Sequence, residues 1–231
     1  MKLSIVVPCY NEAKNIPLIL ERFNAVIIRK DVEVILVNNG STDNSDEVLS
    51  SILSNYSFAR VIKVETNQGY GFGILSGLKA AIGEYLGWTH ADMQTDPNDV
   101  IKALNIIEKQ DMKNVYIKGD RKGRPFFDQL FTTGMSVFES VYLGKKLWDI
   151  NAQPNIFHKD FFNSWSNPPN DFSLDLYVLY VAKKQNVKLI RFDVVFPERT
   201  HGSSSWNTGI NAKIKFIKRT LNFSFKLKKT L

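Results

Sequence analysis

The sequence lacks the features that would place it in an unusual structural class. It has one cysteine, Cys9, in 231 residues, so no disulfide can form within the chain. No segment approaches the roughly 20 apolar residues that cross a bilayer, and the first residues lack the long apolar core of a signal peptide. It also has no Gly/Ser-rich linker, internal repeat or low-complexity block. We therefore expect one globular domain in a reducing compartment and exclude fibrous, disordered and transmembrane classes.

Positive charge is in excess only at the C-terminus. The chain has 30 basic and 23 acidic residues, a net charge of +7, and residues 209–231 contain seven basic residues and no acid. The other 23 basic residues balance the 23 acidic ones in residues 1–208. We therefore divide the chain into a domain over residues 1–208 and a basic tail over 209–231. The neutral body argues against a nucleic-acid-binding module, which would need basic residues across one face of the fold.

Short apolar runs alternate with segments of helical spacing. Strands are predicted at residues 3–7, 32–37, 60–64, 84–89, 115–118 and 188–196, and helices at 11–29, 43–53, 70–82, 98–108 and 171–184. Residues 126–143 are predicted to form a helix or an ordered loop. This alternation predicts an α/β fold with a mainly parallel, Rossmann-like sheet and helices on both faces.

Three polar clusters follow predicted strands. They are Pro8–Glu12, Asn38–Asp43 and His90–Asp96. In open α/β sheets, ligands bind beyond the carboxyl ends of the strands. The spacing therefore predicts one site assembled from three loops.

The third cluster contains candidate metal ligands. His90, Asp92 and Gln94 occupy alternate positions, and in an extended segment their side chains would point the same way. Imidazole, carboxylate and amide oxygen suit Mg²⁺ or Mn²⁺, which would stabilise a diphosphate leaving group. We assign Asp96 to the N-cap of a helix opened by Pro97.

A glycine-rich segment, residues 68–73, does not have the glycine spacing of a dinucleotide-binding loop. Close approach of its backbone to a ligand stays open as an alternative to packing. We expect Cys9, beside a buried strand, to be inert.

Taken in order, the motifs resemble those of the family 2 glycosyltransferases, and most of all the dolichyl- and polyprenyl-phosphate sugar transferases. The resemblance covers roughly residues 3 to 206. The segments that carry it are residues 6–12 (VVPCYNE), 37–43 (VNNGSTD), 67–69 (NQG), 90–94 (HADMQ), 119–121 (GDR), 153–157 (QPNIF), 172–175 (FSLD) and 196–204 (FPERTHGSS).

The resemblance implies an A-type glycosyltransferase fold, a nucleotide-sugar donor, a divalent Mg²⁺ or Mn²⁺ ion and inversion at the anomeric carbon. The implied donor-binding residues are Pro8, Tyr10, Glu12, Asn39, Gly69 and Asp92; the implied metal ligands are Asp92, Gln94 and His90; and the implied catalytic residues are Asp175, Arg121 and Arg199. Asn39 stands where the family usually has an aspartate that contacts the base. His90 replaces the first aspartate of the Asp-x-Asp motif, and the two arginines match residues that contact phosphates.

The acceptor stays open between two classes. A polyprenyl phosphate is already anionic and needs no general base, whereas the hydroxyl of a lipid-linked or surface glycan does need one. Asp175 is the candidate base, or else a residue favoured by the dipole at a helix N-terminus. Ser205 replaces a lysine that often follows the Gly-x-Ser element, which weakens the case for a lipid phosphate. A third hypothesis is a nucleotide-sugar-binding protein without catalysis, because His90 lowers the charge of the metal site.

The tail has an amphipathic pattern. Ile210, Ile214, Ile217 and Leu221 form a stripe at helical spacing, and Phe223, Phe225 and Leu227 continue it with alternation. A basic amphipathic segment is typical of a membrane-surface anchor, although a solvated helix packed on the domain has the same pattern. We favour the membrane, which places the protein on the inner face of the cytoplasmic membrane. The sugar, the base and the oligomeric state are not predicted.

Overall fold

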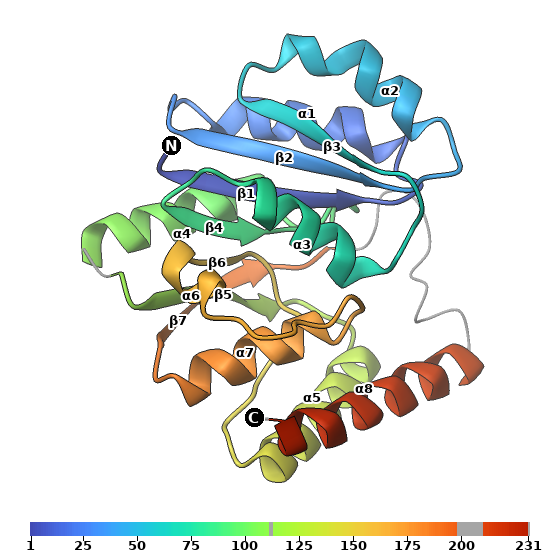
Figure 1. Cartoon of the computed structure of the whole chain (residues 1–231), viewed down its shortest axis with the longest axis vertical. Helices are drawn as coiled ribbons and strands as arrows, with labels where there is room; N and C mark the ends of the chain where they lie inside the picture. Colours follow the sequence, from blue (N-terminus) through green and yellow to red (C-terminus); the bar gives the residue numbers. More distant parts are fainter. Residues whose placement is uncertain (111–112, 198–209, 231) are drawn as a thin grey trace.

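One seven-stranded sheet runs through the molecule (Figure 1). The structure is a computed structural model, and it describes residues 1–110, 113–197 and 210–230. The strands are β1 (Leu3–Cys9), β2 (Val32–Asn39), β3 (Ala59–Val64), β4 (Tyr85–Trp88), β5 (Val115–Lys122), β6 (Asn155–His158) and β7 (Lys188–Val195). Their order across the sheet is β3-β2-β1-β4-β6-β5-β7.

The sheet is mainly parallel, as predicted. β1 pairs in parallel with β2 and β4, β2 with β3, and β5 with β7, whereas β6 runs antiparallel to both β4 and β5. The sequence did not predict β6 as a strand. Its four residues are all buried, so the segment shows no alternation, and it is too short for its apolar content to distinguish a strand from a helix.

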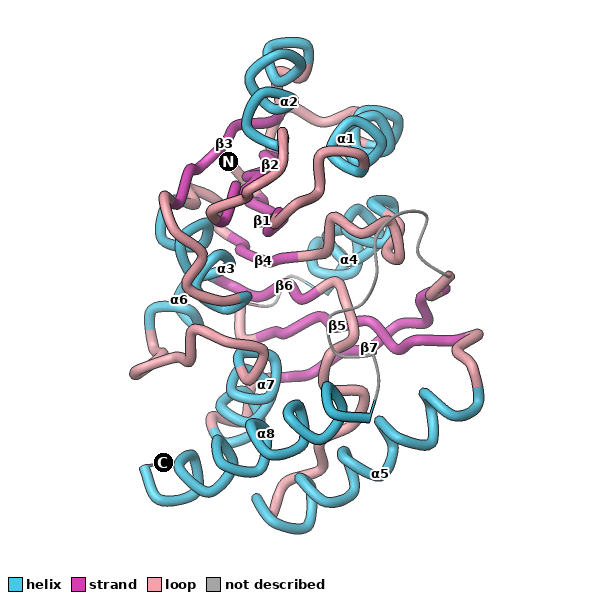
Figure 2. The backbone as a smooth tube through the Cα atoms, turned by 90° about the vertical axis from the view of Figure 1, so that its right-hand side faces the viewer, coloured by secondary structure: helices cyan, strands magenta, loops and turns pink. Residues whose placement is uncertain are grey.

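Helices cover both faces of the sheet (Figure 2). They are α1 (Asn15–Val26), α2 (Ser45–Ile52), α3 (Tyr70–Ala80), α4 (Pro97–Gln110), α5 (Phe126–Leu143), α6 (Lys159–Asn163), α7 (Leu174–Lys184) and α8 (Ile210–Thr230), with a 3₁₀ turn at Leu53–Asn55. Apolar residues of α1, α2 and α4 form one core layer, and those of α3, α6 and α7 form the other. The two-sided α/β prediction is confirmed, and residues 126–143 form a helix, α5, rather than the ordered loop that the sequence also allowed.

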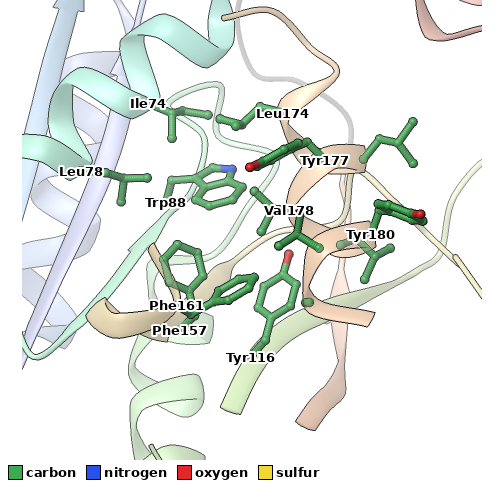
Figure 3. Close-up of a cluster of buried hydrophobic side chains, with 14 of the residues drawn as sticks. Ile74, Leu78, Trp88, Tyr116, Phe157, Phe161, Leu174, Tyr177, Val178 and Tyr180 are labelled. Carbon is green, nitrogen blue, oxygen red and sulfur yellow. The ribbon is translucent and has the colours of Figure 1, made fainter. Parts of the chain in front are cut away.

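The central strands β1, β2, β4 and β6 are buried on both sides, whereas β3 and β7 at the sheet edges are partly exposed. Side chains of β1 alternate between the layers, with Ile5 and Val7 in one and Val6 in the other. Trp88 is fully buried in the second layer, among the aliphatic side chains of α3 and the rings of β6 and α6 (Figure 3). Each such large apolar side chain stabilises the fold by roughly 1.5–3 kcal/mol relative to an exposed one.

The tail forms a single helix that packs on the domain. α8 lies beside α5 in both ribbon views (Figures 1 and 2). Leu227 is buried, Phe223 packs against the core, and the Ser224 hydroxyl donates to Glu139 Oε2 of α5 at 2.6 Å. The helix continues through the stretch in which Phe223, Phe225 and Leu227 alternate with polar residues. Of these three side chains only Phe225, which is 44 % exposed, points outward. One side of the tail helix thus packs on the domain, which is the alternative to membrane binding that the sequence left open.

We expect the α5–α8 contact to depend on pH through Glu139. Burial raises the pKa of this carboxyl from its ordinary 4.5 to about 6, so the folded chain binds the proton more tightly than the unfolded chain. The resulting stabilisation is full below pH 4.5 and is lost as the pH rises through 6. Gln at position 139 does not titrate. The free energy of unfolding of Glu139→Gln, relative to that of the wild type, should therefore rise by about 2 kcal/mol when the pH is raised from 4 to 7.5. Urea unfolding of both proteins at the two pH values measures this change, and a constant difference would contradict it.

Candidate active site

Three loops leave the sheet at one edge. In the register of β1, Cys9 lies opposite Asn38 of β2, and Val6 lies opposite Trp88 of β4. Because the three strands are parallel, the segments that follow them emerge together, on the right-hand side of Figure 1. The predicted convergence of the three polar clusters is therefore present in the fold.

The first two loops are joined by hydrogen bonds. Asn11, in a left-handed backbone conformation with φ 57°, accepts the backbone N–H groups of Thr42 and Asp43 at its Oδ1 atom, at 2.8 and 3.3 Å. The Asn11 N–H in turn donates to Ser41 Oγ at 3.1 Å. This exchange fixes one loop against the other.

The candidate nucleoside residues of the first loop differ in exposure. Pro8 is half-buried and the Tyr10 ring is 46 % exposed. The Glu12 carboxylate accepts the side-chain amide of Asn15 at 2.5 Å, and the Glu12 N–H donates to Ser45 Oγ at 3.1 Å. Of these three residues, Tyr10 presents the largest free surface to a ligand.

Asn39 connects the second loop to the start of α3. Its Nδ2 atom donates to the Gly69 carbonyl oxygen at 3.0 Å. Its Oδ1 atom is buried and has no hydrogen-bond partner in the described part of the chain. A buried acceptor without a donor is uncommon in folded proteins, so this oxygen is suited to receive an N–H from a ligand.

The glycine-rich segment is explained by packing within the chain. A Cβ atom on Gly69 would lie 2.5 Å from the Asn170 carbonyl oxygen, and one on Gly71 would lie 2.5 Å from that of Pro169. The Phe72 N–H donates to the Asn170 carbonyl oxygen at 2.9 Å. The close approach that these glycines allow is therefore to the segment before α7, and Gly69, with φ 113°, also has a backbone conformation that favours glycine.

His90 and Asp92 face each other at the end of β4. His90 Nδ1 lies 3.6 Å from Asp92 Oδ2, and the Asp92 side chain is 6 % exposed. His90 Nε2 is 3.1 Å from the hydroxyl of Tyr70, at the start of α3. The pair thus joins the third loop to the α3 side of the site.

The extended geometry predicted for residues 90–94 is wrong. The segment bends, and Met93 has a positive φ of 65°. The Gln94 N–H donates to Asp92 Oδ1 at 3.1 Å, and its side-chain Nε2 donates to the Pro197 carbonyl oxygen at 3.0 Å. Alternation therefore does not align the three candidate ligands. The predicted cap is confirmed, because Asp96 Oδ1 accepts the Asn98 N–H at 2.9 Å.

The donor set fits a divalent ion with part of its coordination supplied by a ligand. Two donor atoms of one ion, each bound at about 2.1 Å at right angles, lie about 3 Å apart, close to the 3.6 Å between the His90 and Asp92 atoms. In the described ranges, no three His, Cys, Asp or Glu side chains are grouped to hold a metal ion by themselves. An ion here would need further oxygen ligands, such as those of a diphosphate.

Asp175 lies at the N-terminus of α7 in a buried polar network. It is 2 % exposed, and its Oδ1 atom accepts the side-chain amides of Gln153 and Asn155 at 3.2 and 3.4 Å. Burial raises the pKa of Asp175, and the charge of Lys118 opposes this shift. The carboxyl is held in place by two amides and beside one cation.

Lys118 also belongs to this network, and the sequence analysis did not predict it. It is completely buried, and its ammonium donates to the Ala152 carbonyl oxygen and to Asn155 Oδ1, both at 2.7 Å. Burial lowers the pKa of Lys118 to about 7, while the Asp175 charge acts in the opposite direction. The available signal was that Lys118 directly follows the apolar residues 115–117. Because the side chains of that run point into the core from both faces of the strand, the lysine after it is expected to be buried too.

The two predicted arginines are in different situations. Arg121 is nearly buried and forms an ion pair with Asp149, with its Nε atom 2.8 Å from Oδ1 and its backbone N–H 2.8 Å from Oδ2. Arg199 and the segment from His201 to Ser205 lie outside the described residues. The phosphate contacts expected of both arginines stay predictions.

Curated relatives support the resemblance seen in the motifs. The chain is 33 % identical over 112 residues to an undecaprenyl-phosphate 4-deoxy-4-formamido-L-arabinose transferase of Yersinia enterocolitica, a match that covers 47 % of this chain and 34 % of the relative. The transferase of the same name from Pectobacterium carotovorum is 24 % identical over 89 % of this chain and 62 % of its own length. The chain thus spans between one third and two thirds of the relatives it matches.

Solved structures share the fold. Glucosyl-3-phosphoglycerate synthase of Mycobacterium tuberculosis, in complex with Mn²⁺, UDP and phosphoglyceric acid, superposes with a TM-score of 0.75 at 14 % identity over 100 % of this chain and 79 % of that chain. A mannosyltransferase of Pyrobaculum calidifontis, in complex with GDP-mannose and Mn²⁺, gives 0.69 at 17 % identity over 97 % and 63 %. At these identities the likeness establishes the A-type glycosyltransferase fold.

The family itself is established by a match to the chain's own sequence. The model of glycosyl transferase family 2 matches residues 4–174, well over half of the chain, and this range includes all three strand-end loops. The chain therefore belongs to glycosyl transferase family 2.

Proposed function

We propose that the chain is a metal-dependent, inverting glycosyltransferase that moves a hexose from a nucleoside diphosphate sugar to a polyprenyl-phosphate-type acceptor at a membrane surface. The observation that carries the proposal is the contact series at the carboxyl edge of the sheet, from Asn39 to Gly69 and from Tyr70 to His90 and Asp92. It supports the proposal because it brings the Asn39 amide, proposed to bind the base, and the Asp92 carboxylate, proposed to bind the metal, into one site.

The donor would lie across the three loops. Tyr10 offers an exposed ring for the base, and the buried Asn39 Oδ1 atom offers an acceptor for a base N–H. Asp92 and His90 would hold the ion, and Mn²⁺ bound there would stabilise the charge that develops on the leaving diphosphate. The two solved structures named above contain Mn²⁺ with a nucleotide, which supports an ion of this kind.

The acceptor is proposed to be anionic because the curated relatives are named for undecaprenyl phosphate. A phosphate monoester is a nucleophile without a base, so direct displacement needs only alignment. One observation favours a second candidate, transfer to a sugar hydroxyl: Asp175 is a buried carboxyl with a raised pKa, as is typical of general bases.

The outer surface of α5 and α8 is suited to a membrane. Its exposed apolar side chains are Leu130, Val137, Phe138 and Val141 on α5, and Ile214 and Phe225 on α8. Lys218, Lys226 and Lys229 of α8 are also exposed, so apolar and basic groups occur together, as anionic bilayers require. No helix in the described ranges is long and apolar enough to span a bilayer. We propose peripheral binding to the inner face of the cytoplasmic membrane.

The ion site is tested by removing one charge. Asp92→Asn should weaken Mn²⁺-dependent binding of a nucleoside diphosphate at least about tenfold, because a neutral amide holds the ion less tightly than a carboxylate, and it should leave metal-free binding unchanged. Titration calorimetry with and without Mn²⁺ measures both. Asp96→Asn is the matched control, since it removes a charge nearby and asparagine keeps the helix cap. Equal affinities for Asp92→Asn and Asp96→Asn would remove the ion site from the proposal.

The acceptor class is tested by transfer assays with UDP-, GDP- and dTDP-sugars, Mn²⁺ and undecaprenyl phosphate. We expect transfer to the lipid phosphate, and Asp175→Asn should keep kcat within about tenfold because no base is needed. A loss of about 10²–10⁴ with unchanged donor affinity would instead identify Asp175 as a base and a hydroxyl as the acceptor. Donor binding without any transfer would favour a binding protein that lacks catalysis.

Membrane binding is tested by neutralising the exposed lysines of α8. Each basic residue near an anionic leaflet contributes about 1 kcal/mol, so the triple substitution of Lys218, Lys226 and Lys229 by Gln should weaken binding to phosphatidylglycerol vesicles about 100-fold. Substituting Lys30, Lys79 and Lys159, which are exposed elsewhere, is the control for total charge. Vesicle sedimentation measures both variants, and equal losses would contradict a specific role for α8.

A further inference from the structure

Arg219 differs from the exposed lysines of α8 because it contacts the segment before α7. Its guanidinium carbon lies 5.0 Å from the centre of the Phe172 ring, and its Nε atom lies 3.8 Å from Asp171 Oδ2. The Arg219 side chain is 34 % exposed. A basic group of the tail helix therefore lies against the segment that leads to Asp175.

A series of side chains leads from Arg219 to the candidate ion site. The Phe172 ring stacks on the Tyr70 ring, with centres 4.6 Å apart and planes 8° from parallel. The Tyr70 hydroxyl lies 3.1 Å from His90 Nε2 and 3.4 Å from Gln153 Nε2. Arg219 is thus connected to His90 through contacts of the Phe172 and Tyr70 rings.

The segment that Arg219 contacts is fixed from both sides. Asp171 Oδ1 accepts the Ser173 N–H at 2.8 Å, and the Asp171 carbonyl oxygen accepts the Leu174 N–H at 3.2 Å, at the start of α7. The preceding residue, Asn170, is bound to α3 through the Phe72 N–H. The position of Arg219 is therefore set relative to both α3 and α7, which supply Tyr70 and Asp175.

Guanidinium groups bind phosphate through two parallel N–H bonds, and stacking on a ring holds their plane. The Asp171 carboxylate, 3.8 Å from the Arg219 Nε atom, helps to orient the guanidinium. We propose that Arg219 binds the phosphate group of the acceptor and thereby makes α8 a part of the acceptor site. The inference rests on the proposed function. The donor diphosphate is assigned to the Asp92 side, whereas Arg219 contacts Phe172, which stacks on Tyr70.

The test is a kinetic comparison of full-length variants with a short-chain polyprenyl phosphate in detergent, which removes the vesicle surface from the measurement. Arg219→Ala should raise the acceptor KM about 10- to 100-fold, the range for losing a charge-assisted hydrogen bond, and leave the donor KM within twofold. Arg219→Lys should recover part of the loss. Lys218→Ala removes a charge from the adjacent position, so its effect measures charge loss alone and should be at least tenfold smaller.

Asp171→Asn separates phosphate binding from a structural role. The amide keeps an oxygen for the Ser173 N–H but removes the negative charge that competes with a phosphate for Arg219. The acceptor KM should therefore fall in Asp171→Asn and rise in Arg219→Ala. If both variants raise it, or if Arg219→Ala matches Lys218→Ala, the inference is overturned.

A rise in the donor KM of Arg219→Ala instead would assign the arginine to the donor phosphates and also overturn it. Absence of transfer from the wild type to polyprenyl phosphate would contradict the proposed function itself. That outcome is distinct, because it appears before any variant is compared.

Discussion

The parallel pairing of β1 with β2 and β4 decides where every polar loop of the site lies. A shift of one residue in either pairing would turn the buried side chains of β1 to the opposite layer, so the two core layers hold the register. With Cys9 opposite Asn38 and Val6 opposite Trp88, the loops must leave the sheet together. Asn11 and Asn39 then connect them to their neighbours by hydrogen bonds. The position of the site is thus a consequence of how the two core layers pack on the sheet.

Two buried charged residues beside this edge, Lys118 and Asp175, lower the stability of the fold. Lys118 and Asp175 are both removed from water, at a cost that their attraction and their amide partners only partly offset. An apolar pair of similar volume would fill the same space without that cost. Titratable groups whose pKa values burial shifts in opposite directions are concentrated at functional sites. Gln153 connects this pair to the candidate ion site, because its side-chain amide contacts both Asp175 and the Tyr70 hydroxyl, which in turn contacts His90. The network is therefore a candidate part of the proposed site.

Much of the fold was predictable because its strands are continuous apolar runs separated by helical spacing. The strand-end loops were predictable for the same reason, since parallel strands end at one edge. Local backbone geometry was not: the positive φ of Met93 bends the segment that alternation predicted to be extended. The short strand β6 and the position of Lys118 depend on neighbours distant in sequence, which one sequence does not reveal. The inward face of α8 was likewise indistinguishable from a membrane face, because both are apolar.

The central claim is that one edge of the sheet binds the donor's diphosphate through an ion held at Asp92. The most direct measurement is a crystal structure of the chain with Mn²⁺ and a nucleoside diphosphate, in which anomalous scattering locates the ion. The account predicts an anomalous peak within bonding distance of the Asp92 carboxylate, with the base beside Tyr10 and Asn39. A nucleotide bound at another face, or an ion with no contact to Asp92, would contradict it.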